Sequence, residues 1–206
     1  MPNIIVMHPD HPQPRKVDQM VRILDRGGVV AYPTDTVYGF GCDVHNKKAI
    51  DKVYRLKGVP RDHLMSFLCP DLSGISKYAQ VTDKSYRILK RLLPGPYTVI
   101  LRATSMVPRV LLPKRRTVGI RIPDSPIAHA LLDRLGRPIL SSSVTDRDGN
   151  PMLDPHEIRD SFKNGLDAVI DGGFLGDIPS TVVSLINDEV EVLREGKGSL
   201  EPDRKS

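Results

Sequence analysis

Short apolar runs alternate with segments of helical periodicity along nearly the whole chain, and this alternation limits the fold more than any other feature. The apolar runs are bounded by Gly or Pro, which is typical of buried strands. Interleaved strands and helices predict an α/β fold built on a twisted, mixed β-sheet. The expected strands are residues 4–7, 29–32, 64–69, 97–102, 117–122, 138–144, 168–171, 181–185 and 190–194. The expected helices are 15–26, 47–57, 71–78, 83–93, 125–135 and one near 159–163 that Asp154 and Pro155 open.

The composition is that of a globular protein, with 39% hydrophobic and 27% charged residues in a chain of 206. No internal repeat or Gly/Ser linker divides the chain, so we expect a single domain over residues 1–206. Its core would span about residues 15–198, and the polar tail from Ser199 is expected to fray. No apolar run approaches the roughly 20 residues that cross a bilayer, and no secretory signal is visible at the N-terminus. We therefore expect a cytoplasmic protein that does not contact a membrane.

The net charge and the two cysteines limit which ligands the chain is expected to bind. A net charge of +5 attracts anions such as nucleotides, phosphates or RNA. Tryptophan is absent and aromatic residues make up only 5%, which argues against a single-strand binder built on base stacking. Cys42 and Cys69 form no CxxC motif, so a zinc site is not expected, and a cytosolic chain would keep both reduced.

Residues 29–42 combine a strand with small polar side chains. The apolar run 29–32 ends at Pro33, which fixes φ and lacks an N–H donor. Thr34, Asp35 and Thr36 follow directly, and two glycines further on permit a close approach of the backbone. A strand end with these hydroxyls can hold a polar ligand. The alternative is an ordinary strand, turn and second strand.

Residues 117–123, 140–145 and 178–183 repeat this form, an apolar strand with polar residues beside a Pro or Gly. Because ligands of open α/β sheets bind outside the strand ends, these segments are expected to converge on one cleft. Thr117 and Arg121 are four residues apart and therefore lie on the same sheet face. A buried Arg121 must be paired or face a cavity. It could bind a carboxylate or phosphate, or form a structural ion pair.

Other polar residues have both a functional and an ordinary explanation. The run Ser141, Ser142 and Ser143 could bind phosphate through hydroxyls and turn amides, or be a common Ser-rich turn. Lys57 could be a phosphate ligand or a cation that favours a helix C-terminus. Arg194 could touch a ligand or remain solvated.

No nucleophile or metal motif is evident, because GxSxG, GxxxxGK[ST] and GxGxxG are all absent. The histidines show no metal spacing, and most are interpreted as lone surface residues. They are His8, His11, His45, His63, His129 and His156.

Taken together, the ordered motifs resemble the YrdC family over nearly the whole chain. They are YPTDTVYGFG at residues 32–41, KGVP at 57–60, LPGPYT at 93–98, VGIRIP at 118–123, PSTVV at 179–183 and LREG at 193–196. The resemblance implies a twisted mixed sheet with helices around a large basic concave cavity. It also implies synthesis of threonylcarbamoyl-adenylate from threonine, bicarbonate and ATP, with Mg²⁺, for the t6A modification of tRNA. Binding of tRNA or double-stranded RNA is implied as well.

The resemblance also assigns site residues, each at a matching motif position. The threonine contacts would be Thr34, Arg121 and Ser180, and the nucleotide contacts Lys57, Thr117, Ser141, Ser143 and Arg194.

Four positions depart from the family pattern and are closer to its YciO subgroup. Val59 stands in place of the Arg of the Lys-x-Arg motif, with Arg61 nearby but out of register, and Thr145 replaces the Asn of Ser-x-Asn. Leu64 replaces a Pro, and Leu68 stands where a His is frequent. Loss of two phosphate contacts would slow turnover unless other groups compensate. The alternatives are therefore an RNA-binding protein of the same fold with weak or lost activity, and a hydrolase of the same adenylate.

Overall fold

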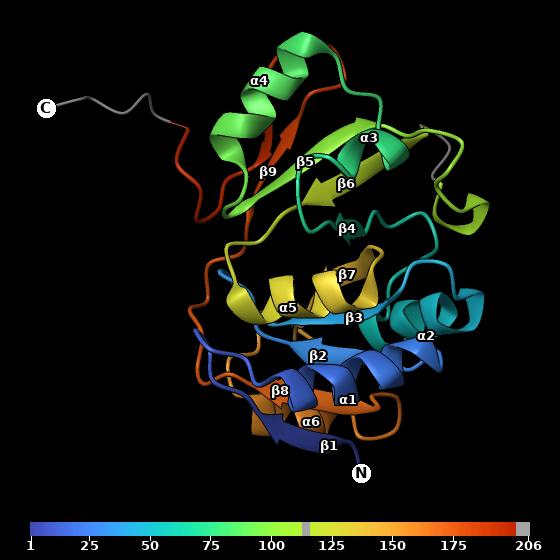
Figure 1. Cartoon of the computed structure of the whole chain (residues 1–206), viewed down its shortest axis with the longest axis vertical. Helices are drawn as coiled ribbons and strands as arrows, with labels where there is room; N and C mark the ends of the chain where they lie inside the picture. The colour runs from blue at the N-terminus through green and yellow to red at the C-terminus, as the bar shows by residue number, and fades with distance from the viewer. Residues whose placement is uncertain (113–115, 201–206) are drawn as a thin grey trace, which may run out of the picture.

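A twisted sheet of ten strands forms the centre of the protein (Figure 1). The computed structural model describes residues 1–112 and 116–200, so residues 201–206 of the expected polar tail lie outside the described residues. Neighbouring strands follow the order β1-β8-β2-β3-β7-β4-β6-β5-β9-β10. Parallel pairs such as β4 with β6 occur beside antiparallel pairs such as β3 with β7. The mixed α/β fold predicted from the sequence is therefore confirmed.

The elements alternate along the chain as the sequence pattern indicated. The strands are β1 (Asn3–Val6), β2 (Val30–Tyr32), β3 (Gly39–Asp43), β4 (Ser66–Leu68), β5 (Tyr97–Arg102), β6 (Thr117–Arg121), β7 (Ile139–Ser143), β8 (Ala168–Asp171), β9 (Thr181–Ser184) and β10 (Glu191–Arg194). The helices are α1 (Pro14–Asp25), α2 (Lys47–Lys57), α3 (Ile75–Tyr78), α4 (Asp83–Leu92), α5 (Pro126–Leu135) and α6 (Pro155–Ser161), with a 3₁₀ helix at Arg109–Leu111.

Local capping signals fix the ends of α2. The side chain of Asn46 accepts a hydrogen bond from the Ala49 N–H at 3.0 Å, which satisfies a free donor of the first turn. Gly58 ends the helix in the left-handed conformation with φ 66°, where a residue with a side chain would be strained. Lys57 therefore stands at the last position of α2, with its long side chain free to reach past the helix end.

Two apolar clusters hold the helices against the sheet. On one face, α1 and α5 pack against each other, and their leucine and methionine side chains meet Val30, Tyr32 and Ile139 of the sheet. On the other face, the cluster includes side chains of α2, α3, α4 and α6. Figure 1 shows α1 and α5 beside the lower strands of the sheet and α3 and α4 beside the upper strands. Within the described residues, no helix is both long and apolar enough to cross a bilayer.

Three details differ from the sequence-based expectation. The helix expected near residues 159–163 begins at Pro155 after the Asp154 cap, as the Asp154-Pro155 signal indicated, but it ends at Ser161 rather than near residue 163. The helix expected over 71–78 forms only at Ile75–Tyr78, because the Asp71 carboxylate accepts from Ser73 and from the Gly74 N–H in a local turn. Residues 29–43 form strand, turn and antiparallel strand, which was the alternative interpretation of this segment.

Candidate functional site

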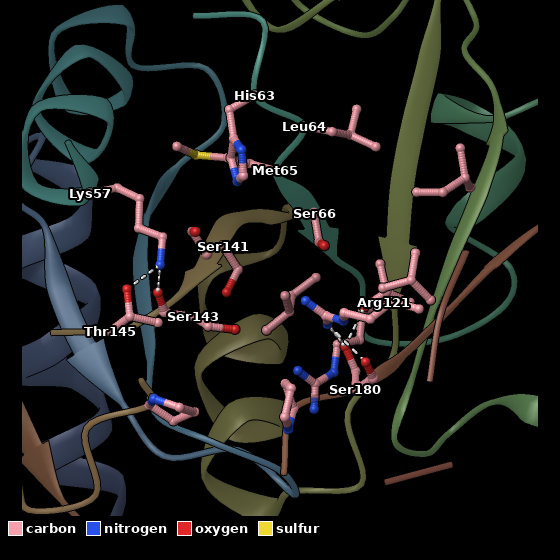
Figure 2. A pocket seen from close by; sticks show the side chains of 18 of the residues that line it. Lys57, His63, Leu64, Met65, Ser66, Arg121, Ser141, Ser143, Thr145 and Ser180 are labelled. Atoms are coloured by element: carbon pink, nitrogen blue, oxygen red, sulfur yellow. Dashed lines mark hydrogen bonds between the residues drawn. The ribbon is translucent and has the colours of Figure 1, made fainter. Parts of the chain in front are cut away.

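A cavity of about 430 Å³ opens on the part of the sheet that lies beyond α1 and α5 (Figure 2). It collects residues from the end of α2, from β4 to β7, and from the segments around β9 and β10. The sequence segments expected to converge are thus brought together around one hollow. Its polar lining residues are Lys57, His63, Ser66, Thr98, Arg121, Ser141, Ser142, Ser143, Thr145, Ser180 and Arg194.

The strand register explains the cavity floor. Ser66 of β4 pairs with Ser141 of β7 on one side and with Gly119 of β6 on the other, and Gly119 pairs with Ile100 of β5. Residues in register place their side chains on the same face of a sheet. This face is the one that α1 and α5 cover at Ile139, next to Ser141 by strand alternation. Beyond the ends of α1 and α5, the cavity floor presents the hydroxyls of Ser66 and Ser141 on one side and the apolar side chain of Ile100 on the other.

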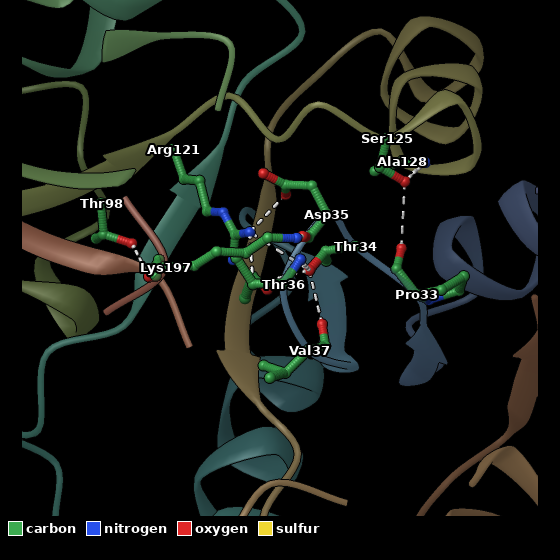
Figure 3. Close-up of polar contacts among 12 residues, drawn as sticks. Pro33, Thr34, Asp35, Thr36, Val37, Thr98, Arg121, Ser125, Ala128 and Lys197 are labelled. Atoms are coloured by element: carbon green, nitrogen blue, oxygen red, sulfur yellow. Dashed lines mark hydrogen bonds and ion pairs between the residues drawn. The ribbon is translucent and has the colours of Figure 1, made fainter. Parts of the chain in front are cut away.

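Arg121 is held in the cavity wall by the turn after β2 (Figure 3). Its Nη2 donates to Asp35 Oδ1 at 2.6 Å, to Thr36 Oγ1 at 2.7 Å and to Thr34 Oγ1 at 3.4 Å. The Arg121 and Asp35 side chains are only 8% and 10% exposed. The structure therefore contains the structural ion pair that was one of the two expectations for Arg121, and the same guanidinium also lines the cavity.

The buried ion pair between Arg121 and Asp35 leaves two of its polar atoms without a hydrogen-bond partner in the part of the chain that the structure describes. Among the described residues, Arg121 Nε and Asp35 Oδ2 are buried atoms without a hydrogen-bond partner. An unpaired buried polar atom costs on the order of 1–3 kcal/mol, so such atoms are rare without a functional reason. The guanidinium is thus pre-positioned by one nitrogen and retains unused donors beside the cavity, which suits a ligand carboxylate or phosphate.

Tyr32 orients Ser141 across the sheet. Its hydroxyl donates to Ser141 Oγ at 2.6 Å, and both residues are buried. The ring passes over β3 where Gly39 and Gly41 lack side chains, because a Cβ on Gly41 would lie 2.5 Å from Tyr32 Cε1. Burial raises the pKa of Tyr32, so its hydroxyl stays protonated and acts as the donor. Ser141 therefore accepts from Tyr32 and keeps its own proton for a ligand.

Lys57 crosses from α2 to the hydroxyl side of the cavity. Its Nζ donates to the Ser143 carbonyl at 2.9 Å and to Thr145 Oγ1 at 2.6 Å (Figure 2). The residue in place of the family Asn thus anchors the lysine. The ammonium has one N–H left for a ligand, since an ammonium has three donors.

The opposite wall is formed by the segment before β9 and by β10. Arg194 Nη2 donates to the Ser180 carbonyl at 2.8 Å, and Ser180 Oγ lies 2.8 Å from Thr98 Oγ1. Lys197 Nζ donates to the Asp35 carbonyl at 2.5 Å, which ties the segment after β10 to the turn that holds Arg121 (Figure 3). These bonds connect residues that are far apart in the sequence.

The cavity is strongly electropositive. Burial and the neighbouring Arg194 lower the pKa of Lys57, while burial and Arg121 lower the pKa of Arg194. Burial and Lys57 lower the pKa of His63. Of the described residues that line the cavity, none is Asp or Glu. Cations that depress one another's pKa gain from a bound anion, so the arrangement favours a phosphate or carboxylate ligand.

The predicted site residues differ in how directly they face the cavity. The structure places Lys57, Arg121, Ser141, Ser143, Ser180 and Arg194 in its lining. Thr34 lies behind Arg121 and bonds the Val37 carbonyl at 2.6 Å. Thr117 is buried at the far end of β6, paired with Arg102, and does not line the cavity. Its nucleotide contact stays a prediction.

Sequence reasoning missed His63, Ser66 and Thr98. His63 follows the KGVP motif closely, and this position was the available signal for it. Ser66 and Thr98 lie inside strand-like runs, so only the sheet register reveals that they share the face of Arg121. Val59 packs against the apolar core. Arg61 contacts Asp51 and lies 4.9 Å from the centre of the Tyr54 ring.

The fold and the site define an α/β protein with a cation-lined cavity on an open sheet face. Residues 22–196 match the family model for Sua5/YciO/YrdC proteins, described as telomere recombination. The chain belongs to this family. It is 42% identical to the YciO protein of Escherichia coli K12 over 205 residues, covering 98% of this chain and 99% of that one.

Three further comparisons concern one synthase and two solved structures. The threonylcarbamoyl-AMP synthase of Bacillus subtilis is 33% identical over 186 residues, which cover 88% of this chain and 53% of that protein. The crystal structure of E. coli YciO matches with a TM-score of 0.94 over 98% of each chain. Pyrococcus abyssi Sua5 in complex with L-threonine matches with a TM-score of 0.86 at 28% identity, over 94% of this chain and 57% of that one.

The chain offers no resident magnesium site in the part that the structure describes. No group of three or more His, Cys, Asp or Glu side chains is placed to hold a metal ion. Mg²⁺ prefers carboxylate and phosphate oxygens, and the described cavity lining provides no carboxylate. These residues therefore do not fit a protein-bound Mg²⁺.

Proposed function

We propose that the cavity binds threonine and ATP and forms threonylcarbamoyl-adenylate, the reaction of the synthases in this family. The observation that carries the proposal is the arrangement of cations around one hollow. Arg121 is held rigidly on one wall, and Lys57 and Arg194 flank it. A volume of about 430 Å³ lies within the range of roughly 300–1,000 Å³ for small-molecule sites.

Arg121 would bind the threonine carboxylate. Asp35, Thr34 and Thr36 fix the guanidinium through Nη2 alone, which leaves other donors for the bidentate geometry that a carboxylate prefers. Ser180 and Thr98 lie beside the amino-acid position, where their hydroxyls can meet the polar groups of threonine. P. abyssi Sua5, which shares the fold, binds L-threonine, and this supports the assignment.

Lys57, Arg194 and the serine hydroxyls would bind the nucleotide phosphates. The threonine amine reacts with bicarbonate to give a carbamate and water. A carbamate oxygen then attacks the α-phosphorus of ATP, and the bond to the β-phosphate oxygen breaks to release pyrophosphate. The substrate supplies its own nucleophile, so the reaction needs no catalytic Ser or Cys. The protein contributes by positioning the reactants and by stabilising the charge that develops on the phosphate oxygens.

Release of pyrophosphate is the direct test. The assay would measure pyrophosphate with ATP present and with threonine or bicarbonate omitted in turn. We expect release that depends on both, and loss of it in Arg121→Met. The matched control is Arg134→Met, which removes an arginine from the exposed surface of α5, where its side chain is 64% exposed. No release above a protein-free blank would refute the synthase activity.

Hydrolysis of the same adenylate is a second candidate, favoured by the reduced set of phosphate donors. Val59 packs against the core and has no donor, and Thr145 Oγ1 accepts from Lys57, so these two positions offer a triphosphate fewer donors than an Arg and an Asn would. A site with fewer donors suits an adenylate better than ATP. Incubation with threonylcarbamoyl-adenylate should then yield AMP faster than in the protein-free control. Binding of tRNA or double-stranded RNA stays a prediction.

A further inference from the structure

We propose that His63 is an anion ligand of the cavity that binds phosphate as an imidazolium, and that it takes up a proton when the anion binds. This inference rests on the proposed function only in taking that anion to be a phosphate chain. It concerns a residue for which neither the sequence pattern nor the comparisons supply a role.

The loop after α2 presents one further basic side chain to the cavity. Val59 packs against the core, and Arg61 is turned away towards Asp51 and the Tyr54 ring. Among residues 58–64, all of which the structure describes, only His63 and Leu64 line the cavity. His63 therefore stands where a second positive group beside Lys57 would contact the same anion.

The backbone of His63 is fixed while its ring remains available. Its N–H donates to the Pro60 carbonyl at 3.0 Å, and its carbonyl accepts from the Tyr54 hydroxyl at 3.0 Å. Its imidazole makes no hydrogen bond to any described residue. Figure 2 shows the ring on the same side of the cavity as Lys57, above the serine hydroxyls of β7. A fixed backbone with a free ring is the arrangement expected of a ligand-binding side chain.

The charged groups around His63 are mainly repulsive. Lys57 from the end of α2 opposes protonation of the ring, and Asp62 in its own loop favours it weakly. Tyr54 touches only the carbonyl. Arg194 and Arg121 also line the cavity, but neither is a cause of the lowered pKa of His63. Partial burial of the ring, together with Lys57, favours the neutral imidazole in the absence of a ligand at neutral pH.

The loop before α6 closes the same cavity through Gly149 and Pro151. Its charged residues are Asp146, Arg147 and Asp148. Asp146 is already bound to Asn150 and to the backbone of its own turn. None of these three is a cause of the lowered pKa of His63.

A bound phosphate chain reverses this balance. Its negative charge offsets Lys57 and stabilises the imidazolium, so the pKa of His63 rises when the anion binds. Between the pKa values of the free and the bound states, one linked proton makes the affinity fall by about tenfold for each unit increase in pH. Tripolyphosphate itself still ionises between neutral and mildly alkaline pH, so the proton taken up by His63 is measured as the difference between the unmodified protein and His63→Gln.

The experiment is calorimetric titration of the full chain with inorganic tripolyphosphate at several pH values between about 7 and 8.5. Buffers of different ionisation enthalpy report the protons taken up. We expect more proton uptake and a steeper fall of affinity with pH in the unmodified protein than in His63→Gln. The control His45→Gln, which changes an exposed histidine between β3 and α2, should behave like the unmodified protein.

The outcomes separate the two proposals. Tripolyphosphate binding with His63-dependent proton uptake supports the inference even if no pyrophosphate is released in the synthase assay. A pH dependence that is as steep in His63→Gln as in the unmodified protein assigns the proton to another group, such as Lys57 or the ligand, and overturns it. Equal affinity of the two proteins at all pH values also overturns it, as does failure of tripolyphosphate to bind.

Discussion

Replacing Arg121 with Met should destabilise the protein far more than removing an average surface charge. The substitution keeps much of the apolar side chain but leaves the Asp35 carboxylate, 10% exposed, without its counter-ion. Breaking a buried ion pair by removing one partner costs about 3–5 kcal/mol. For a chain of this size, each kcal/mol lowers Tm by about 2–4 °C, so we expect a drop of about 6–20 °C.

Two further variants test whether the unpaired Asp35 carboxylate causes this loss of stability. Asp35→Asn should cost less than Arg121→Met, because Arg121 keeps its bonds to Thr34 and Thr36 and lies beside the open cavity. The double variant Asp35→Asn/Arg121→Met removes both charges and should be more stable than Arg121→Met alone, since no carboxylate is then left unpaired in a buried site.

Thermal and urea unfolding of the four proteins would measure this cycle. The two substitutions should be non-additive, and the double variant should recover on the order of 1–3 kcal/mol relative to Arg121→Met. If the double variant is no more stable than Arg121→Met, then the unpaired Asp35 carboxylate is not the source of the loss, and the explanation by a buried charge without its counter-ion is wrong.

Three further predictions follow from the buried residues. Gly41→Ala should lower Tm and displace Tyr32, because the added Cβ would lie 2.5 Å from the ring, whereas Gly176→Ala, with open space around it, should have little effect. Cys42 and Cys69 are buried, and burial raises both pKa values, so a disulfide reagent at pH 8 should label neither until the chain unfolds. The unfolding free energy should fall as pH rises above about 9, because the thiol of Cys69 ionises there in the unfolded chain, while burial raises its pKa in the folded protein to about 12. The variant Cys69→Ala should show a weaker decline over the same pH range.

Many elements could be predicted from local signals alone. The helix Lys47–Lys57 and the strand Tyr97–Arg102 lie where the sequence placed them. In α2, apolar spacing, the Asn46 cap and Gly58 all indicate the same structure. The helix that Asp154 and Pro155 were expected to open does begin at Pro155, but it ends at Ser161, where the weak periodicity gave no stop signal. The strand Gly39–Asp43 was considered only as an alternative, because its glycines obscure the strand pattern.

The site could be predicted only in part. Arg121 and Ser141 were identified because polar residues in or after an apolar strand are conspicuous. The partner of Ser141 is Tyr32, which is 109 residues away, and no local pattern predicts that contact. Thr117 shares the sheet face of Arg121, as its spacing indicated, yet the cavity does not extend to it.

The sequence by itself determined the types of the elements, the mixed α/β class and the family, because these depend on local periodicity, capping and motifs. Only the tertiary structure decided where the site lies. The strand order places β7 between β3 and β4, and α1 and α5 cover just part of one face. That uncovered area and the direction of each side chain, His63 included, are set by packing between segments distant in the chain, which a linear pattern does not encode.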